Sequence, residues 1–514
     1  MPARPHPITT RRIWLGICGV LLVLGIFFRF YHLGYKVYWI DEVNTTLRSL
    51  GYTTALVEDT LLTGKPFTVA DLQSFQQLSP ERGWDDTWNS LRGSAEHTPL
   101  YFLLSRWWVE RFGSTIVVWR SLAAVLSLLT FPALFWLCWE LFQTSLPGWL
   151  AIGLVAVSPL HVLYAQEARP YSLLALMTLL SCASLLWGMR TQRWHSWIVY
   201  GMTIALGLYT QLLFGLVAIA HTLYILLMEG RLTQTVRRFS VVTAGAIAAF
   251  TPWLFLLAAN LATVQRKTAS LSEATPFSKL VDGWFRVLNQ MLIDWELAGW
   301  NVVLVVGAIV ATVILIRYAP RRAWLLLVLV GGVSFLGLAL PDLVVGGERS
   351  LRVRYLFPTA LSLQIALAYS FSRSIPAKTT WQQWGQGLLV VLLVSQIASC
   401  AVTSQKNLWW NKSRPRSTYY QPVSAILNQA TNPLVLTESK VSDLLALSYW
   451  LRPNLMLQAI PSPEAIDISS NSHTFYLLNG SSETQAALTR QGYTLLLLYP
   501  LTPAAEVRLW QIQP

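Results

Sequence analysis

Charged residues are scarce in this chain. Asp, Glu, Lys and Arg make up only 12% of its 514 residues, about half of the roughly 25% that soluble domains carry. Hydrophobic residues account for 54%, and the mean hydropathy is +0.45. This composition excludes an ordinary soluble globular protein. Repeated apolar runs of about 20 residues predict a polytopic membrane protein instead.

Cysteine is also rare, and the four cysteines lack the spacing of metal ligands. They are Cys18, Cys138, Cys182 and Cys400. All lie inside predicted membrane-spanning segments, so we interpret them as packing residues. The first apolar run lacks a cleavage site as well, because Cys18-Gly19-Val20 leads into more apolar chain. We therefore expect this run to be a retained span and not a cleaved signal peptide.

Negative charge is the scarcer sign, with 25 acidic against 38 basic residues and a formal net charge of +13. In a soluble protein such an excess would suggest nucleic acid. Here the basic residues fall mostly in short loops between apolar runs, where membrane topology explains them. We therefore expect no nucleic-acid partner.

Eleven apolar segments predict membrane spans. They are residues 13–31, 115–142, 147–163, 170–189, 195–211, 212–228, 239–259, 299–317, 322–340, 354–372 and 385–403. With eleven spans, the arginine and lysine clusters of the short loops all fall on one side, which the positive-inside rule assigns to the cytoplasm. We therefore expect a multi-pass protein of the plasma (inner) membrane, with a cytoplasmic N-terminus and an extracytoplasmic C-terminal part.

The pattern changes after about residue 418, where short apolar runs alternate with amphipathic segments. The runs Pro433–Thr437, Leu455–Ile460, Thr474–Leu478 and Tyr493–Tyr499 predict strands, and Lys440–Leu451 and Ser482–Gln491 predict helices. Such alternation is typical of a small α/β domain, although it lacks a Gly-rich phosphate loop. The predicted fold class is an α-helical polytopic membrane domain over 1–404, a linker over 405–418, and a soluble α/β domain over 419–514.

The predicted outer loop 32–114 is too long to be a plain connector. Within it, Pro99–Phe112 places apolar and charged side chains on different faces of a helix. We expect this helix to lie in the membrane interface.

Five polar clusters are predicted on the outer face. They are Asp41-Glu42, Glu96-His97, the corner Gln166–Arg169, the basic residues of loop 260–298, and Arg349, Arg352, Arg354 and Tyr355. An acidic site beside several cations suits sugar transfer from a lipid-linked phosphosugar. Arginine binds the phosphate, a carboxylate takes the proton of the acceptor hydroxyl, and cations stabilise the departing phosphate.

Each cluster also has a simpler interpretation. Asp41 and Glu42 could cap the next segment or face solvent. Arg169, which precedes Pro170 at the start of a span, could bind lipid head groups. His97 could position substrate, bind a metal, or be an ordinary interfacial histidine.

These residues together resemble the GT-C glycosyltransferases. The resemblance is carried by Asp41-Glu42, by the segment Glu96-His97-Thr98-Pro99-Leu100-Tyr101-Phe102, by the segment from Ser158 to Arg169 that ends in Gln166-Glu167-Ala168-Arg169, by Tyr209-Thr210-Gln211, and by Arg354-Tyr355. The nearest members are the protein O-mannosyltransferase and aminoarabinose (lipid A) transferase-like proteins of bacteria. The match is spread over residues 10–404. Thr98 stands where relatives usually have proline, and Gln211 where they usually have histidine. The second change leaves a metal-binding or histidine-based contact in doubt.

The resemblance implies an enzyme that uses a polyprenyl-phosphate sugar on the outer membrane face, with Asp41 at the reaction centre. The candidate catalytic residues are Asp41 and Glu42. The candidate donor-phosphate and substrate residues are Glu96, His97, Tyr101, Gln166, Glu167, Arg169, Arg352, Arg354 and Tyr355. We assign no metal ligand and no certain cofactor, and a divalent cation stays open.

The predicted function is an inverting glycosyltransferase of the cell envelope, with membrane lipids around it and a lipid, glycan or protein as acceptor. The main alternative is a transporter or flippase of lipid-linked sugars. Transporters usually place charges near the bilayer midplane, whereas the polar clusters here sit at span ends. A structural membrane protein that recruits partners is a third interpretation.

Overall fold

The computed structural model describes residues 7–262, 265, 275–295, 301–375, 378–461, 468, 473–499 and 507–514. The chain divides into two compact units. A helical unit comprises Met1–Leu33, Gly93–Tyr101 and Arg120–Gln405, and a sheet unit comprises Gly34–Arg92, Phe102–Trp119 and Lys406–Pro514. The predicted domain boundaries at 404 and 419 stay a prediction, and the compact units group the residues differently.

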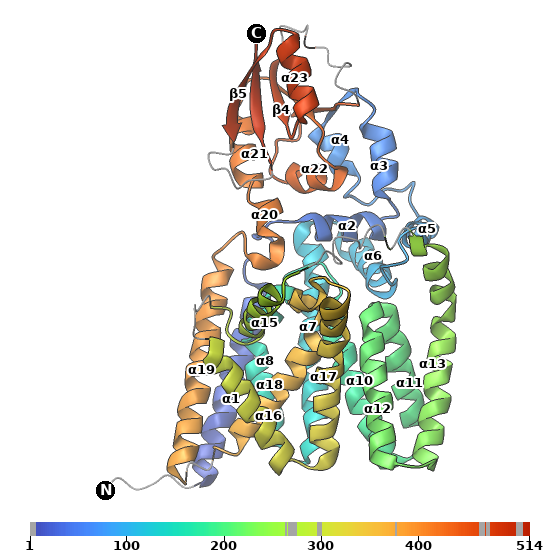
Figure 1. Cartoon of the computed structure of the whole chain (residues 1–514), viewed down its shortest axis with the longest axis vertical. Coiled ribbons are helices and arrows are strands. Elements are labelled where there is room, and N and C mark those ends of the chain that lie inside the picture. The colour runs from blue at the N-terminus through green and yellow to red at the C-terminus, as the bar shows by residue number, and fades with distance from the viewer. Residues whose placement is uncertain are drawn as a thin grey trace. The chain divides into compact units, whose positions relative to one another are not determined.

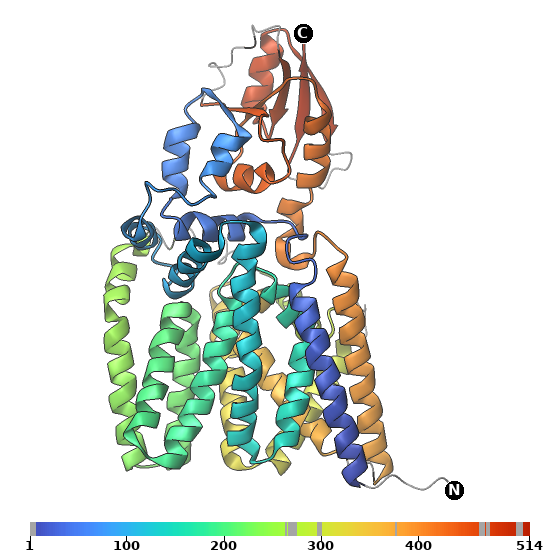
Figure 2. The ribbon, with the colours of Figure 1, turned by 180° about the vertical axis from the view of Figure 1, so that it is seen from behind.

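Helices build the helical unit, and most of them are long, apolar and run side by side (Figure 1). They are α1 (Pro7–Phe30), α7 (Ile116–Phe142), α8 (Ser145–Ala156), α9 (Pro159–Ala165), α10 (Tyr171–Thr191), α11 (Trp194–Thr210), α12 (Gly215–Glu229), α13 (Gln234–Ala259), α15 (Phe277–Leu292), α16 (Asn301–Tyr318), α17 (Arg321–Val344), α18 (Phe357–Ser372) and α19 (Thr380–Ser404). In the view from behind, α1 lies against α8 and α19 (Figure 2).

All eleven predicted spans coincide with helices. Among the described residues, seven helices are long and apolar enough to cross a membrane, and an eighth span arises if the bent pair α8–α9 counts as one. The others are shorter: α11 has 17 residues and α18 has 16. At 1.5 Å per residue, 17 residues reach about 25 Å, slightly less than the hydrocarbon core. The chain is a multi-pass integral membrane protein.

The predicted span 147–163 is broken between α8 and α9, which meet at an angle of 61°. Ser158 precedes Pro159, and a residue before proline is disfavoured in the helical conformation. The break leaves carbonyl groups at the end of α8 that need partners. The buried Arg29 of α1 supplies them, because Nη1 donates to the Ala156 carbonyl at 2.6 Å and Nη2 to the Val155 carbonyl at 3.2 Å.

Gly25 permits this close approach of α1 to α8. A Cβ atom built at Gly25 would lie 2.5 Å from the carbonyl oxygen of Ala156. Any larger residue would push the two helices apart at the level of the break.

The sheet unit contains a six-stranded mixed sheet in the order β1-β3-β2-β4-β6-β5. Its strands are β1 (Pro66–Thr68), β2 (Pro433–Thr437), β3 (Met456–Ala459), β4 (Thr474–Leu478), β5 (Thr494–Tyr499) and β6 (Leu509–Gln513). The central strands β3, β2 and β4 are parallel, and the outer strands pair antiparallel. All four predicted strands are confirmed, as are the two predicted helices, which form α22 (Val441–Ser448) and α23 (Ser482–Arg490).

The predicted loop 32–114 contributes much of this unit. Its elements are β1, α2 (Ile40–Ser49), α3 (Thr54–Leu61), α4 (Val69–Ser74), α5 (Trp84–Arg92) and α6 (Leu100–Phe112). Helix α6 confirms the helix predicted over Pro99–Phe112. Helices α2, α3 and α4 pack against α22, and β1 pairs with β3. Most of the loop is therefore a structural part of the sheet unit, whereas its segment Gly93–Tyr101 belongs to the helical unit.

Candidate functional site

The acidic pair lies in the first turn of α2. Negative side chains there are stabilised by the positive end of the helix dipole, and extended Trp39 starts the helix without a side-chain cap. The two carboxyl groups differ in exposure: Asp41 is partly exposed, whereas Glu42 is fully buried.

Glu42 is ion-paired with Lys412. The Lys412 Nζ donates to Glu42 Oε2 at 2.8 Å, and both side chains are 0% exposed. Lys412 ends the short turn η5 (Trp410–Lys412), which follows α19. Lys412 had no signal in the sequence, because it lies 370 residues from Glu42 and outside every motif.

In the helical unit, the corner Gln166–Arg169 joins α9 to α10 and is buried throughout. Gln166 fixes it to the end of α1, since its Nε2 donates to the carbonyl groups of Phe28 at 2.7 Å and Tyr31 at 2.8 Å. Glu167 is fully buried. The Arg169 guanidinium lies 5.8 Å from the ring centroid of Tyr171. Pro170 occupies the N-cap position of α10, so Arg169 lies two residues before the first helical residue, Tyr171.

An aromatic cluster links this corner to the start of α18. Tyr164 of α9 packs edge-on against Tyr171 of α10 and Phe357 of α18, with centroid distances of 5.0 and 5.5 Å. Phe357 stacks on Tyr171 at 6.2 Å. The structure therefore joins the segments next to two predicted clusters, because Tyr171 follows the Gln166–Arg169 corner and Phe357 follows Arg354 and Tyr355.

Arg352, Arg354 and Tyr355 were predicted to open the tenth span, but α18 begins only at Phe357. Arg354 and Tyr355 lie in the 3-10 turn η4 (Val353–Tyr355), and Arg352 joins it to the turn η3 (Arg349–Leu351). The Arg354 guanidinium lies 5.5 Å from the Tyr355 ring centroid. Arg352 is exposed, 4.0 Å from Glu348.

The turn η3 is pinned to the end of α17 by the fully buried Asp342. This carboxylate accepts hydrogen bonds from the Ser350 backbone N–H at 2.7 Å and the Ser350 hydroxyl at 2.8 Å. Arg349 pairs with the same carboxylate at 3.0 Å. Arg349 is therefore engaged in holding the turn.

The pair Glu96-His97 precedes α6. His97 Nε2 lies 3.9 Å from Glu96 Oε1, and both side chains are partly buried. Trp253 of α13 donates its indole N–H to the Ala95 carbonyl at 3.0 Å. The structure thus ties this segment to α13. Tyr101 is fully buried in the first turn of α6.

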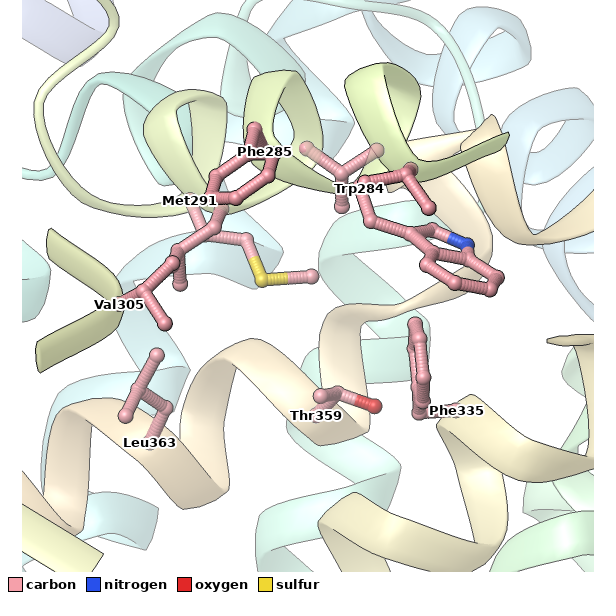
Figure 3. Close-up of a pocket in the computed structure, with 10 residues that line it drawn as sticks. Trp284, Phe285, Met291, Val305, Phe335, Thr359 and Leu363 are labelled. Carbon is pink, nitrogen blue, oxygen red and sulfur yellow. The ribbon is translucent and has the colours of Figure 1, made fainter. Parts of the chain in front are cut away.

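An apolar cavity of about 330 Å³ opens beneath α15. Figure 3 shows Trp284, Phe285 and Met291 of α15 on one side and Leu363 of α18 on the other. The remaining lining residues are Val281, Val287, Leu288, Val305, Phe335 and Thr359. The polar atoms of this wall are already engaged: Trp284 Nε1 donates to Ser350 Oγ at 2.9 Å, and the Thr359 hydroxyl donates to the Gly331 carbonyl at 2.9 Å.

The cavity suits an apolar ligand and no polar one, because its wall offers no spare hydrogen-bonding group. It is also tied to the arginine-bearing turns. Trp284 bonds directly to Ser350 of η3, and Leu363 lies on the helix that begins two residues after Tyr355.

Two further predictions concern cations. The predicted loop 260–298 contains α15, which carries its basic residues Lys279 and Arg286. Lys279 is ion-paired with Glu348, and Arg266 and Lys267 lie outside the described residues. In the described part of the chain, no three His, Cys, Asp or Glu side chains come close enough to hold a metal ion.

Comparison with known proteins adds to this geometry. Residues 96–256 match the family described as dolichyl-phosphate-mannose-protein mannosyltransferase. The fold is similar to the crystal structure of ArnT from Cupriavidus metallidurans bound to undecaprenyl phosphate, with a TM-score of 0.53 and 12% identity over 97% of this chain and 98% of that one. Residues 96–256 are thus similar to this family, and the chain as a whole has a fold similar to that of ArnT. The resemblance to GT-C proteins that the sequence indicated is thereby confirmed.

The apo state of the same ArnT gives a TM-score of 0.51 and 12% identity, over 96% of this chain and 97% of that one. No curated protein matches the sequence. At 12% identity the structural likeness establishes a shared ArnT-like fold, while the roles of individual residues rest on the site itself.

Proposed function

We propose that this protein is a membrane glycosyltransferase that moves a sugar from a polyprenyl-phosphate donor to an acceptor hydroxyl. The observation that carries the proposal is the apolar cavity under α15, whose wall leads into the arginine-bearing turns before α18. A polyprenyl-phosphate sugar has the same division, with a long apolar chain joined to one charged phosphate. The match of residues 96–256 to a family named for dolichyl-phosphate mannose supports this donor class.

The arginines are suited to the phosphate. Arg169 and Arg354 lie on turns that the Tyr171–Phe357 stack joins, and a guanidinium offers several N–H donors to phosphate oxygens. They would bind the donor phosphate and stabilise the charge that grows on it as it leaves. Phosphate is a good leaving group, so the reaction needs no strong general acid.

Asp41 is the proposed base. In the inverting reaction the acceptor oxygen attacks the anomeric carbon and forms the new glycosidic bond. The bond from that carbon to the phosphate oxygen breaks, and its electron pair leaves with the polyprenyl phosphate. The acceptor proton passes to the Asp41 carboxylate. The family resemblance implies this role for Asp41, and its partial exposure is consistent with it.

The proposal includes an orientation in the plasma membrane. The positive-inside pattern puts the N-terminus in the cytoplasm and the sheet-bearing C-terminal residues outside. The substrates would then be a polyprenyl-phosphate sugar and a lipid, glycan or protein acceptor on the outer face, as in glycosylation of the cell envelope.

Transfer of radiolabelled sugar from polyprenyl-phosphate donors tests this function. Wild-type membranes should transfer label, and Asp41→Asn should reduce transfer about a hundredfold, the loss typical of a removed general base. Donor binding should persist in this variant. Full transfer by Asp41→Asn at equal protein level would remove Asp41 from the mechanism.

The alternative of a flippase is tested with the protein reconstituted into vesicles. A flippase would move labelled donor across the vesicle bilayer without forming glycosylated product. That outcome would replace the transferase proposal.

A further inference from the structure

We infer that Lys412 is a positioning residue: by pairing with buried Glu42, it fixes helix α2 and thereby the orientation of Asp41. The inference rests on the proposed function, because Asp41 is the base of that reaction. It assigns different roles to the two neighbouring carboxylates, with Asp41 reacting and Glu42 anchoring.

The burial of the pair is the first argument. Both side chains are 0% exposed and their charged atoms lie 2.8 Å apart. Removing two charges from water is costly, and a well-packed apolar pair often stabilises a fold equally well. A buried ion pair is therefore poorly explained by stability alone. The pair does favour one arrangement of the two segments that carry it, because burying either charge without its partner is strongly unfavourable.

Lys412 also stands on a hydrogen-bonded turn. Its backbone N–H donates to the Trp409 carbonyl at 3.0 Å, and its carbonyl accepts from the Ser417 hydroxyl at 2.6 Å. The next residue, Ser413, has a positive φ of 50°, so the chain reverses directly after the lysine. The ammonium group is thus presented from a fixed backbone.

The segment leading into α2 also lies alongside the segment after α19. The Val37 backbone N–H donates to the Asn407 carbonyl at 2.8 Å, and Lys36 Nζ donates to the Lys406 carbonyl at 3.0 Å. The Glu42–Lys412 pair is the third link between the same two stretches and the one nearest to Asp41. Residues 36–42 are therefore held along their length by residues 406–412.

Another part of α2 is held by α22. Ser442 donates to the Asn44 side chain at 3.2 Å. The Tyr38 ring, just before α2, packs edge-on against Tyr449 with centroids 5.1 Å apart. The Tyr38 hydroxyl also bonds to Thr46 within α2. With these contacts in place, loss of the Lys412 link should rotate or loosen the first turn of α2 and leave the helix itself folded.

Four variants separate positioning from chemistry: Lys412→Met, Lys412→Arg, Glu42→Gln, and the double variant Glu42→Gln/Lys412→Met. The matched controls are Lys440→Met and Glu483→Gln, which change exposed charges of the same sign in the same unit. Each variant is purified in detergent, and kcat and donor KM are measured per amount of folded protein.

Lys412→Met should lower kcat at least about tenfold with little change in donor KM, since misplacement of a reacting group by an ångström can cost a hundredfold. Lys412→Arg should recover most of the rate, because it keeps the charge. The double variant should unfold at the wild-type temperature yet keep the low kcat. Wild-type kcat in Lys412→Met would overturn the inference. So would a fully active Lys412→Met beside an inactive Glu42→Gln, which would make Glu42 the base.

A second measurement is independent of activity. The native cysteines are buried, so a thiol introduced by Asp41→Cys can be followed with a membrane-impermeant maleimide. Its labelling rate should change several-fold when Lys412→Met is added and stay constant with Lys440→Met. An unchanged rate would overturn the inference. If the wild type transfers no sugar, the proposed function fails, while this labelling still decides whether Lys412 orients residue 41.

Discussion

Phe357 stacks on Tyr171, with ring centroids 6.2 Å apart and ring planes inclined by only 7°. One ring begins α18 and the other begins α10. Each follows a candidate phosphate ligand by two or three residues, Arg169 before Tyr171 and Arg354 before Phe357. We therefore expect the stack to set the spacing of the two arginines.

Phe357→Leu should weaken donor use without removing either arginine. Aromatic pairs contribute about 0.5–1.5 kcal/mol beyond the area that they bury, so the donor KM should rise roughly twofold to tenfold. Phe239→Leu, a buried phenylalanine of α13 outside both the cavity and this stack, provides the control. Donor titration of both variants in membranes checks the difference, and an unchanged KM in Phe357→Leu would show that the stack does not set the spacing.

Arg169→Ala should lower donor use strongly. A hydrogen bond to a charged group contributes about 1.5–3 kcal/mol, which corresponds to about a tenfold to hundredfold loss in kcat/KM. Arg169→Lys should recover only part, because it cannot offer two parallel donors to a phosphate. Arg317→Ala, in the last turn of α16, should leave transfer unchanged. Full activity of Arg169→Ala at equal protein level would exclude Arg169 from the site.

Filling the cavity should discriminate against long donors. Leu363→Trp places a larger side chain into the space of about 330 Å³ and should raise the KM for undecaprenyl-phosphate sugar more than that for a short-chain analogue. Val306→Trp, at an exposed position on the neighbouring α16, is the matched control. Equal effects on both donors would mean that the polyprenyl chain lies elsewhere.

The proposed orientation of the protein in the membrane predicts where a fused reporter enzyme will be active. A reporter enzyme that works only outside the cytoplasm, joined after Pro514, should be active, because eleven spans from a cytoplasmic N-terminus end outside. The same reporter after Arg193, between the fourth and fifth predicted spans, should be silent. A stably expressed but silent fusion at Pro514 would change the span count by one and reverse the functional face.

The start of α5 should be sensitive to acid. The Gly83 backbone N–H donates to Asp86 at 2.8 Å and Arg82 pairs with it at 3.0 Å, and these hydrogen bonds lower the pKa of the Asp86 carboxyl. A depressed folded-state pKa stabilises the fold above the ordinary aspartate pKa of about 3.9. This contribution is lost as pH falls through the folded value.

Asp86→Asn should therefore lower the unfolding temperature near neutral pH and approach the wild-type value as the pH falls below about 4. Thermal unfolding of both proteins in detergent across this range is the measurement. A difference that grows on acidification would contradict the assignment.

Much of the helical unit could be predicted, because a membrane span is recognisable in the sequence from its length and its apolar composition. All eleven segments lie on helices. The bend between α8 and α9 also had a sequence signal in Ser158-Pro159. The hydrogen bonds that satisfy the carbonyl groups at this bend come from Arg29 of another helix, which the local sequence does not indicate. Helix α15 was not predicted, because its 16 residues form an amphipathic helix with one apolar and one polar face. Its mean hydropathy is therefore lower than that of a membrane span.

The site was less predictable than the fold. Motifs located Arg169 and Arg354, but only packing shows that the Tyr171–Phe357 stack joins them. The partner of Glu42 could not be found at all, because a lone lysine 370 residues away has no local pattern. Strand β1 is similar: three residues carry no periodicity, and their pairing with β3 is decided by the finished sheet.

Strand β1 has a consequence for biosynthesis. Gly64 and Gln458, which are bonded beside the β1–β3 pair, are 394 residues apart in the chain. At about 5–20 residues per second, the ribosome needs roughly 20–80 s to make the intervening stretch, and every predicted span is synthesised within that time or before it. The edge of the sheet therefore closes only after membrane insertion is nearly finished. Until then strand β1 of loop 32–114 has no pairing partner and is accessible to proteases and chaperones on its side of the membrane.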